Sequence, residues 1–210
     1  ERIVGLPYNR VPNEDIRYKS LNKILKPLLK LYKETHIVIE KNNYINMLKK
    51  DFDFAIDNLP PIYKREDKQK LIMLFNEIST SIAANEINLA VTHGDFQPAN
   101  IIIDSSPNNI VYAIDWEYSK QRHFLYDVLV FEVKARRTIG LAKRLKVLDI
   151  KKFKWIYQSL GIPHLDLKDD IIKFFLLEDL CLRVEELKIP NLKSKSLNLE
   201  NFISEVEYIV

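Results

Sequence analysis

Cysteine and long apolar runs are both scarce in this sequence of 210 residues, and each scarcity excludes a class of protein. The chain has one cysteine, Cys181, so neither a disulfide framework nor a cysteine-based zinc site is available. No stretch approaches the roughly 20 uninterrupted apolar residues that a membrane-spanning helix needs. The net charge of +3 is too mild to indicate a nucleic-acid partner by itself. We therefore expect a globular protein in a reducing, cytoplasmic compartment.

Glycine is also scarce, with four in the whole chain, while apolar residues recur at spacings of three and four. Both features indicate a mainly helical protein. The periodicity predicts helices within residues 21–32, 44–52 and 66–82. It resumes near Phe124 and continues toward the C-terminus, with a break at Gly161-Ile162-Pro163.

The middle of the chain has a different pattern. Two β-branched runs, Ile101–Ile103 and Ile110–Ile114, are separated by six turn-forming residues, which predicts a β-hairpin. A short apolar segment, Leu89–Val91, precedes them. The predicted fold class is therefore mainly α with a small β-hairpin (α+β).

Polar residues lie at both ends of this hairpin. His93-Gly94-Asp95 comes before it, with Asn100 five residues after the aspartate, and Asp115 directly follows the return strand. Paired strands lie about 5 Å apart, so the hairpin should place Asn100 beside Asp115, with Asp95 close by.

Phosphoryl transfer requires such a set of oxygen-bearing side chains. A carboxylate must orient the attacking hydroxyl and accept its proton, and we assign this role to Asp95. Magnesium must bridge the phosphates, and it prefers hard oxygen ligands such as carboxylates and amide carbonyls. Asn100 and Asp115 are the predicted Mg²⁺ ligands.

The segment from Val91 to Ile101 closely resembles the catalytic loop of the aminoglycoside phosphotransferase and choline kinase superfamily. Ile114–Tyr118 resembles its metal-binding segment, and Tyr126–Val128 resembles a third element, in which an aspartate at a helix start braces the loop. The resemblance implies a small-molecule kinase that uses Mg²⁺ and transfers the γ-phosphoryl group of ATP or GTP to a hydroxyl. The acceptors it implies are aminoglycosides, amino alcohols or sugars.

The same resemblance implies the C-terminal lobe of a protein-kinase-like fold. Upstream of the loop the sequence has no Gly-rich turn, so we expect the N-terminal, nucleotide-holding lobe to be absent and this chain alone to be nearly inactive. Within one structural domain we expect three parts. Residues 1–88 would form a linker and the first helices, 89–130 the catalytic loop, hairpin and metal-binding segment, and 131–210 a helical, substrate-binding part.

Two further residues are expected to support the loop. His93 should hold it through a hydrogen bond of its ring, and Asp127 should brace it from the helix start. A plainer interpretation, in which Asp95 only caps a turn and Asn100 only starts a strand, leaves their joint spacing unexplained.

Five residues are candidates for substrate binding: Trp116, Glu117, Tyr118, Glu178 and Asp179. Trp116 and Tyr118 could form an aromatic wall for a cation, or could pack in the core. Glu117 could contact a second metal or form a surface ion pair. Glu178 and Asp179 fall in an acidic cluster on a predicted helix, for which a solvated face is the commoner explanation.

Two alternatives of other classes stay open. The chain could be a kinase-like binding module without catalysis, although an unused site has no need of Asp95, Asn100 and Asp115 together. The stretch Lys134–Lys154 holds nine basic residues against one acid in an amphipathic pattern, which could bind a nucleic acid or an acidic membrane. A solvated helix is the commoner origin of such a stretch. We expect neither partner, only a hydroxyl substrate and the N-terminal lobe of the same protein.

Overall fold

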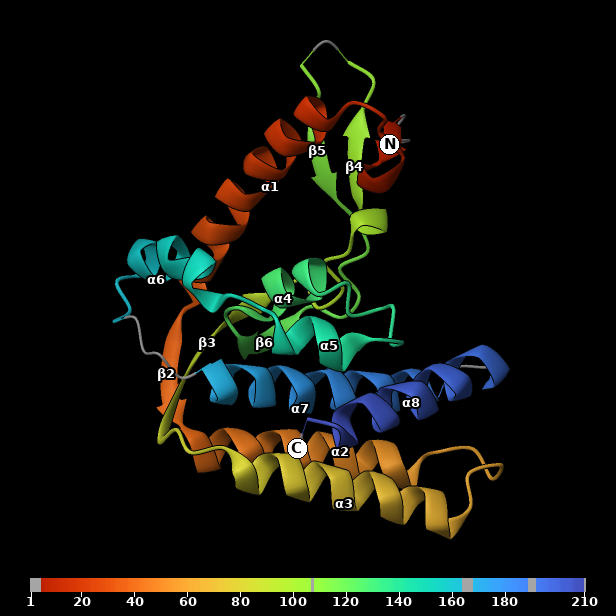
Figure 1. Cartoon of the computed structure of the whole chain (residues 1–210). Coiled ribbons are helices and arrows are strands. Elements are labelled where there is room, and N and C mark those ends of the chain that lie inside the picture. The colour runs from red at the N-terminus through yellow and green to blue at the C-terminus, as the bar shows by residue number, and fades with distance from the viewer. Residues whose placement is uncertain (1–4, 107, 164–167, 189–191, 210) are drawn as a thin grey trace. The chain divides into compact units, whose positions relative to one another are not determined.

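A computed structural model describes residues 5–106, 108–163, 168–188 and 192–209 (Figure 1). The described chain is mainly helical with two small sheets, so the predicted α+β class is confirmed. None of the helices in these ranges is both long enough and apolar enough to cross a bilayer. The functional division of the chain at residues 88 and 130 stays a prediction. The structure does not describe every residue in its three parts, since it leaves out residues 1–4, 107, 164–167, 189–191 and 210.

The chain divides by its internal contacts into two compact units, each built from three separate segments. The loop unit, named for the predicted catalytic loop, comprises Glu1–Ile37, Asn88–Arg136 and Ile150–His164. The helical unit comprises Val38–Ile87, Arg137–Asp149 and Leu165–Val210.

The predicted hairpin is present in the loop unit. Strands β4 (Ile101–Asp104) and β5 (Val111–Ala113) pair antiparallel, with Ile101 opposite Ala113 and Ile103 opposite Val111. A third strand, β1 (Gly5–Pro7), pairs with β4 and gives the sheet order β1-β4-β5. The Asp104 carboxylate accepts hydrogen bonds from the backbone N–H groups of Ser106 and Ile110, which closes the turn between β4 and β5.

A second small sheet lies directly before the catalytic loop. It has the order β2-β3-β6, formed by β2 (Ile37–Glu40), β3 (Glu86–Thr92) and β6 (Lys120–His123). β3 and β6 pair antiparallel, so that Thr92, at the end of β3, lies opposite Lys120. The sheet thus connects the start of the loop with the segment that follows Asp115.

Helix α1 (Glu14–Thr35) begins where the Asn13 side chain accepts a hydrogen bond from the Ile16 N–H at 3.1 Å. Its buried face repeats every four residues through Ile24, Leu28 and Tyr32, and it packs against β5 and α6 (Lys154–Leu160). The last of these residues, Tyr32, reaches the catalytic loop.

The remaining elements of the loop unit are short. They are the 3₁₀ turns η1 (Tyr8–Arg10), η2 (Pro98–Asn100) and η3 (Ile150–Phe153), and the helix α4 (Tyr126–Glu132). As predicted, Gly161 ends a helix, because it follows α6 in the left-handed conformation at φ 70°.

In the helical unit, α2 (Lys41–Asp57) and α3 (Arg65–Ser81) both pack on α7 (Lys168–Glu186). Helix α7 also contacts α8 (Leu192–Glu207), which in turn contacts α5 (Leu141–Lys146). Almost every α7 residue from Asp170 to Val184 is buried. A helix buried on all sides forms a core rather than a surface layer.

The basic stretch Lys134–Lys154 is not one amphipathic helix. It forms the six-residue α5, the turn η3 and the first residue of α6, and it is divided between the two units. Gly140, in the left-handed conformation at φ 77°, interrupts it directly before α5. The expectation of a single helix was therefore wrong, because periodicity in charge and hydropathy does not reveal such breaks.

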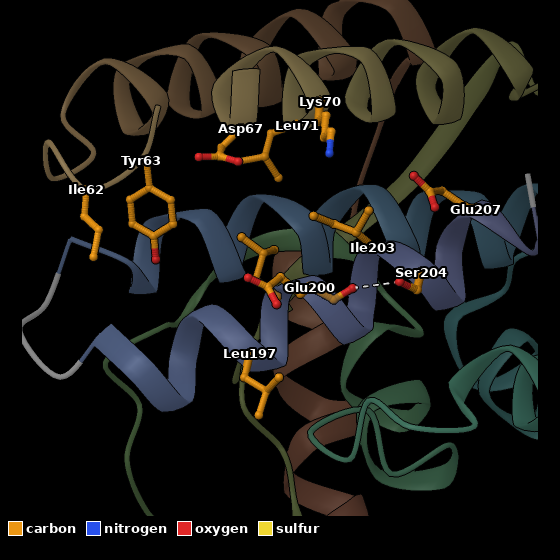
Figure 2. Close-up of a pocket in the computed structure, with 11 residues that line it drawn as sticks. Ile62, Tyr63, Asp67, Lys70, Leu71, Leu197, Glu200, Ile203, Ser204 and Glu207 are labelled. Carbon is orange, nitrogen blue, oxygen red and sulfur yellow. Dashed lines mark hydrogen bonds between the residues drawn. The ribbon is translucent and has the colours of Figure 1, made fainter. Parts of the chain in front are cut away.

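A pocket of about 630 Å³ opens between α3 and α8 in the helical unit (Figure 2). Apolar side chains of both helices line it, Leu71 from α3 and Leu199 and Ile203 from α8. Tyr63 stands at one end of it. Charged side chains of both signs, including Lys70 and Glu207, stand around it. None of the predicted site residues lines this pocket.

His123, at the end of β6, makes the stability of the fold depend on pH. Burial lowers the pKa of His123 from 6.5 to about 3, and its Nδ1 accepts the Leu125 N–H at 3.3 Å. The folded state thus favours the neutral ring, and this contribution is complete above pH 6.5 and is lost as the pH falls toward 3.

We expect the free energy of unfolding to fall by roughly 1 kcal/mol from this residue between pH 7.5 and 5.5, measured by urea denaturation. His123→Asn retains an acceptor for the Leu125 N–H but does not titrate, so its stability should change less over this range. His36→Gln is the matched control, because His36 is only half-buried. An equal pH dependence in His123→Asn and the unchanged protein would contradict the prediction.

Candidate functional site

The predicted catalytic loop contains a residue that must be glycine. Gly94 has φ 88°, which favours glycine, and a Cβ there would lie 2.8 Å from Arg122 Nη1 and closer still to the Tyr118 carbonyl oxygen. Arg122 Nη1 donates at 2.9 Å to both Thr92 Oγ1 and the Tyr118 carbonyl. The loop therefore passes tightly over the chain that follows Asp115.

Asp127 holds the loop from the first turn of α4. Its carboxylate is fully buried and accepts the N–H groups of His93 at 2.7 Å and Gly94 at 2.9 Å, and also the Tyr32 hydroxyl at 2.8 Å. Burial, and the adjacent Asp127 charge, raise the pKa of Tyr32 well above its ordinary value, so the hydroxyl remains a donor. One carboxylate thus joins α1, α4 and the catalytic loop.

His93 connects the loop to the far end of the hairpin. Its Nδ1 accepts the Asp95 N–H at 3.3 Å, so the other ring nitrogen carries the proton and donates to the Ile114 carbonyl at 2.8 Å. Ile114 immediately precedes Asp115. The buried ring therefore fixes the loop aspartate relative to the second aspartate.

The Asp95 carboxylate accepts hydrogen bonds on both oxygens. Oδ2 accepts from Asn100 Nδ2 at 2.9 Å and from Gln97 Nε2 at 2.8 Å, while Oδ1 accepts from Arg136 Nε at 2.5 Å. The Asp95 side chain is 14% exposed. It is held in one orientation yet remains open to a small group from solvent.

Asn100 and Asp115 meet at the mouth of the hairpin, as predicted from its register. The Ile114 N–H donates to the Asn100 carbonyl at 2.9 Å, which places Asp115 one residue beyond the pair. Asp115 has φ 69°, a left-handed conformation that aspartate tolerates better than most residues. Such backbone strain is often retained at functional sites.

These two residues fit a magnesium ion. Asn100 Nδ2 donates to the Asp95 carbonyl and carboxylate, which directs the amide oxygen away from Asp95. In the described ranges neither that oxygen nor the exposed Asp115 carboxylate has a hydrogen bond from the protein, and both are hard ligands. No cluster of three His, Cys, Asp or Glu side chains occurs in the same ranges, so phosphate and water oxygens would complete the coordination.

The aromatic and acidic residues after Asp115 are partly exposed. Trp116 is 40% exposed and donates from Nε1 to the Ala113 carbonyl at 2.9 Å. Its ring packs on that of His93, with 4.5 Å between the ring centroids. Glu117 is exposed and Tyr118 is half-buried. Substrate contact by these three residues stays a prediction.

Glu178 and Asp179 do not lie on a solvated face, because both are buried in α7. Glu178 accepts the Tyr44 hydroxyl at 2.5 Å, and Asp179 pairs with Arg183 at 2.8 Å. The expectation of solvated carboxylates was wrong, because an acidic cluster on a helix does not show which partners the fold supplies. Both belong to the helical unit, and their predicted substrate role remains untested.

Three contacts of the site were not foreseen from the sequence. Tyr32 binds Asp127 across 95 residues, Arg136 binds Asp95 across 41, and Gln97 binds Asp95 within the loop. Only Gln97 had a local signal, as an amide two residues after the aspartate. Arg136 belonged to the basic stretch and could not be distinguished there from its neighbours.

Comparison with known proteins gives two matches and one negative result. Residues 58–140 match the model of the phosphotransferase enzyme family, and they include Asp95, Asn100, Asp115, Asp127 and Arg136 but not Tyr32, Glu178 or Asp179. The fold is similar to that of a Plasmodium vivax ethanolamine kinase, with a TM-score of 0.52 and 15% identity, over 100% of this chain and 62% of that protein. No curated protein matches the sequence.

A choline/ethanolamine kinase family protein from Mesorhizobium loti is also similar, with a TM-score of 0.47 and 14% identity, over 77% of this chain and 52% of that one. This chain therefore spans less than two thirds of the length of either solved relative. The resemblance to the aminoglycoside phosphotransferase and choline kinase superfamily, predicted from three short segments, is confirmed.

Proposed function

We propose that the protein containing this chain transfers the γ-phosphoryl group of ATP or GTP to a hydroxyl of a small molecule such as an aminoglycoside, an amino alcohol or a sugar. The observation that carries the proposal is the Asp95 carboxylate, oriented by Asn100 and Gln97 beside a hairpin that ends in Asp115. The family match over residues 58–140 supports the same reaction class.

In the proposed reaction the substrate hydroxyl oxygen attacks the γ-phosphorus, and the bond from that phosphorus to the β,γ-bridging oxygen breaks. The hydroxyl proton moves to Asp95, and the nucleoside diphosphate leaves with the bridging oxygen. Asn100 Oδ1 and the Asp115 carboxylate would hold magnesium, which supplies neutralisation of the phosphate charge when it is bound. Asp127 and His93 keep the loop in place throughout.

The direct test is phosphoryl transfer from labelled ATP and GTP to a panel of ethanolamine, choline, aminoglycosides and sugars. It uses the intact protein, including any sequence outside this chain. The chain alone is assayed in parallel, because we expect it to transfer little phosphate. Saturable, magnesium-dependent transfer to at least one hydroxyl compound is the expected result. Magnesium-dependent nucleotide binding without transfer to any of them would instead support a binding module.

Asp115→Asn is expected to raise the magnesium concentration needed for half-maximal nucleotide binding by at least about tenfold. Even residues that contact only the ligands of a metal contribute that much to its affinity. Asparagine tolerates the left-handed backbone at φ 69°, so the change removes charge without adding strain. Magnesium titration of nucleotide binding by calorimetry measures the effect. Asp51→Asn, at an exposed position of α2, is the matched control. Equal magnesium requirements in the two variants would remove Asp115 from the site.

A further inference from the structure

Arg136 makes two hydrogen bonds to successive residues of the catalytic loop. Its Nε donates to Asp95 Oδ1 at 2.5 Å and its Nη2 donates to the Gly94 carbonyl at 3.0 Å. The arginine side chain is 19% exposed and the aspartate 14%, so solvent screens this pair less than a surface ion pair. Because the guanidinium is planar and forms both bonds, it fixes the Asp95 carboxylate relative to the loop backbone at Gly94.

The three donors on Asp95 leave one acceptor position in the plane of the carboxylate. Each carboxylate oxygen can accept about two hydrogen bonds. Oδ2 already accepts from Gln97 and Asn100, whereas Oδ1 accepts from Arg136 alone among the contacts of this side chain. The vacant position is therefore on Oδ1, next to the guanidinium.

We infer that Arg136 is a positioning residue for Asp95, and that the substrate hydroxyl delivers its proton to Oδ1 beside it. This inference rests on the proposed function. Arg136 holds the carboxylate rotated so that Oδ1 faces the hydroxyl, while Gln97 and Asn100 occupy the opposite oxygen. The other titratable groups at the loop are His93, Asp115 and Asp127, and none of them donates to Asp95 through its side chain in the described contacts.

Removal of the arginine should affect the chemical step rather than substrate binding. We expect Arg136→Met to lower kcat by about 10- to 100-fold, the range for loss of a charge-assisted hydrogen bond, with KM for the nucleotide unchanged. Arg136→Lys should restore only part of kcat, because lysine keeps the charge and loses the planar two-point contact.

Arg137→Met is the matched control, because Arg137 is the next residue, is exposed, and binds Arg144 through its backbone carbonyl rather than its side chain. The double variant Asp95→Asn with Arg136→Met tests the coupling. If Arg136 acts through Asp95, the second change should lower kcat no further than Asp95→Asn alone. The folded fraction of each variant is measured by thermal unfolding and kcat is expressed per folded molecule, so that a lower stability of Arg136→Met does not enter the comparison.

The outcomes separate the two proposals. Transfer that does not depend on Asp95 would overturn the proposed function itself. Transfer that depends on Asp95, but with equal kcat in Arg136→Met and Arg137→Met, would overturn only the inference about Arg136. An additive effect in the double variant would also overturn it, because a positioning residue has nothing to position once the base is removed.

Discussion

Asp95→Asn is expected to lower phosphoryl transfer by about 10²- to 10⁴-fold, the usual contribution of a positioned general base. Asparagine has the shape of aspartate but does not accept the hydroxyl proton. Asn100 and Asp115 are unchanged in this variant, so magnesium-dependent nucleotide binding should stay within about twofold of the unchanged protein. Steady-state transfer assays and nucleotide titration of the same preparation measure the two quantities.

Asp51→Asn makes the same chemical change at an exposed position of α2 and should leave both quantities unaltered. The asparagine at position 95 places an NH₂ group where one of the two aspartate oxygens accepts a hydrogen bond, either from Arg136 or from the Gln97 and Asn100 amides. A modest loss of stability is therefore expected and is measured by thermal unfolding. Undiminished transfer by a folded Asp95→Asn variant would refute Asp95 as the proton acceptor.

Asp127→Ala is expected to destabilise the loop unit by at least about 3 kcal/mol, because three donors lose their acceptor at once and two of them are buried backbone N–H groups. The catalytic loop should also become mobile, so transfer should fall although Asp127 touches no reacting atom. Urea denaturation gives the stability change, and hydrogen exchange at His93 and Gly94 reports loop opening.

Two variants separate the contributions within this network. Tyr32→Phe removes one donor and leaves both loop N–H groups bound, so we expect a smaller loss of about 1–2 kcal/mol. Asp127→Asn keeps the shape of the side chain but turns an NH₂ group toward one of the donors. Its loss of unfolding free energy should therefore lie between those of Tyr32→Phe and Asp127→Ala. A loss below 1 kcal/mol in Asp127→Ala, with unchanged exchange at His93 and Gly94, would show that the loop is held by other contacts.

The parts of the site that could be predicted from the sequence are local in the chain. Asn100 and Asp115 are brought together by a hairpin whose β-branched runs and turn residues are contiguous, so strand pairing alone fixes their positions.

The contacts that could not be predicted depend on the path of the chain between distant segments. β6 reads Lys-Gln-Arg-His, with no apolar alternation, and becomes a strand because β3 lies beside it. Arg136 reaches Asp95 only after the chain has passed through the hairpin, β6 and α4. Asp179 is likewise buried because Arg183 pairs with it and the packing of α7 encloses it, which no charge pattern reveals.

The division into two units has a practical consequence for studies of how this chain unfolds. Both tryptophans, Trp116 and Trp155, fall in the loop unit, whereas the chain's single cysteine, Cys181, is buried within α7 of the helical unit. Indole fluorescence should therefore report the melting of one unit, and alkylation of the thiol should report exposure of the other. The unmodified polypeptide carries a separate probe for each half, and the order in which the halves lose structure is measurable without an introduced label.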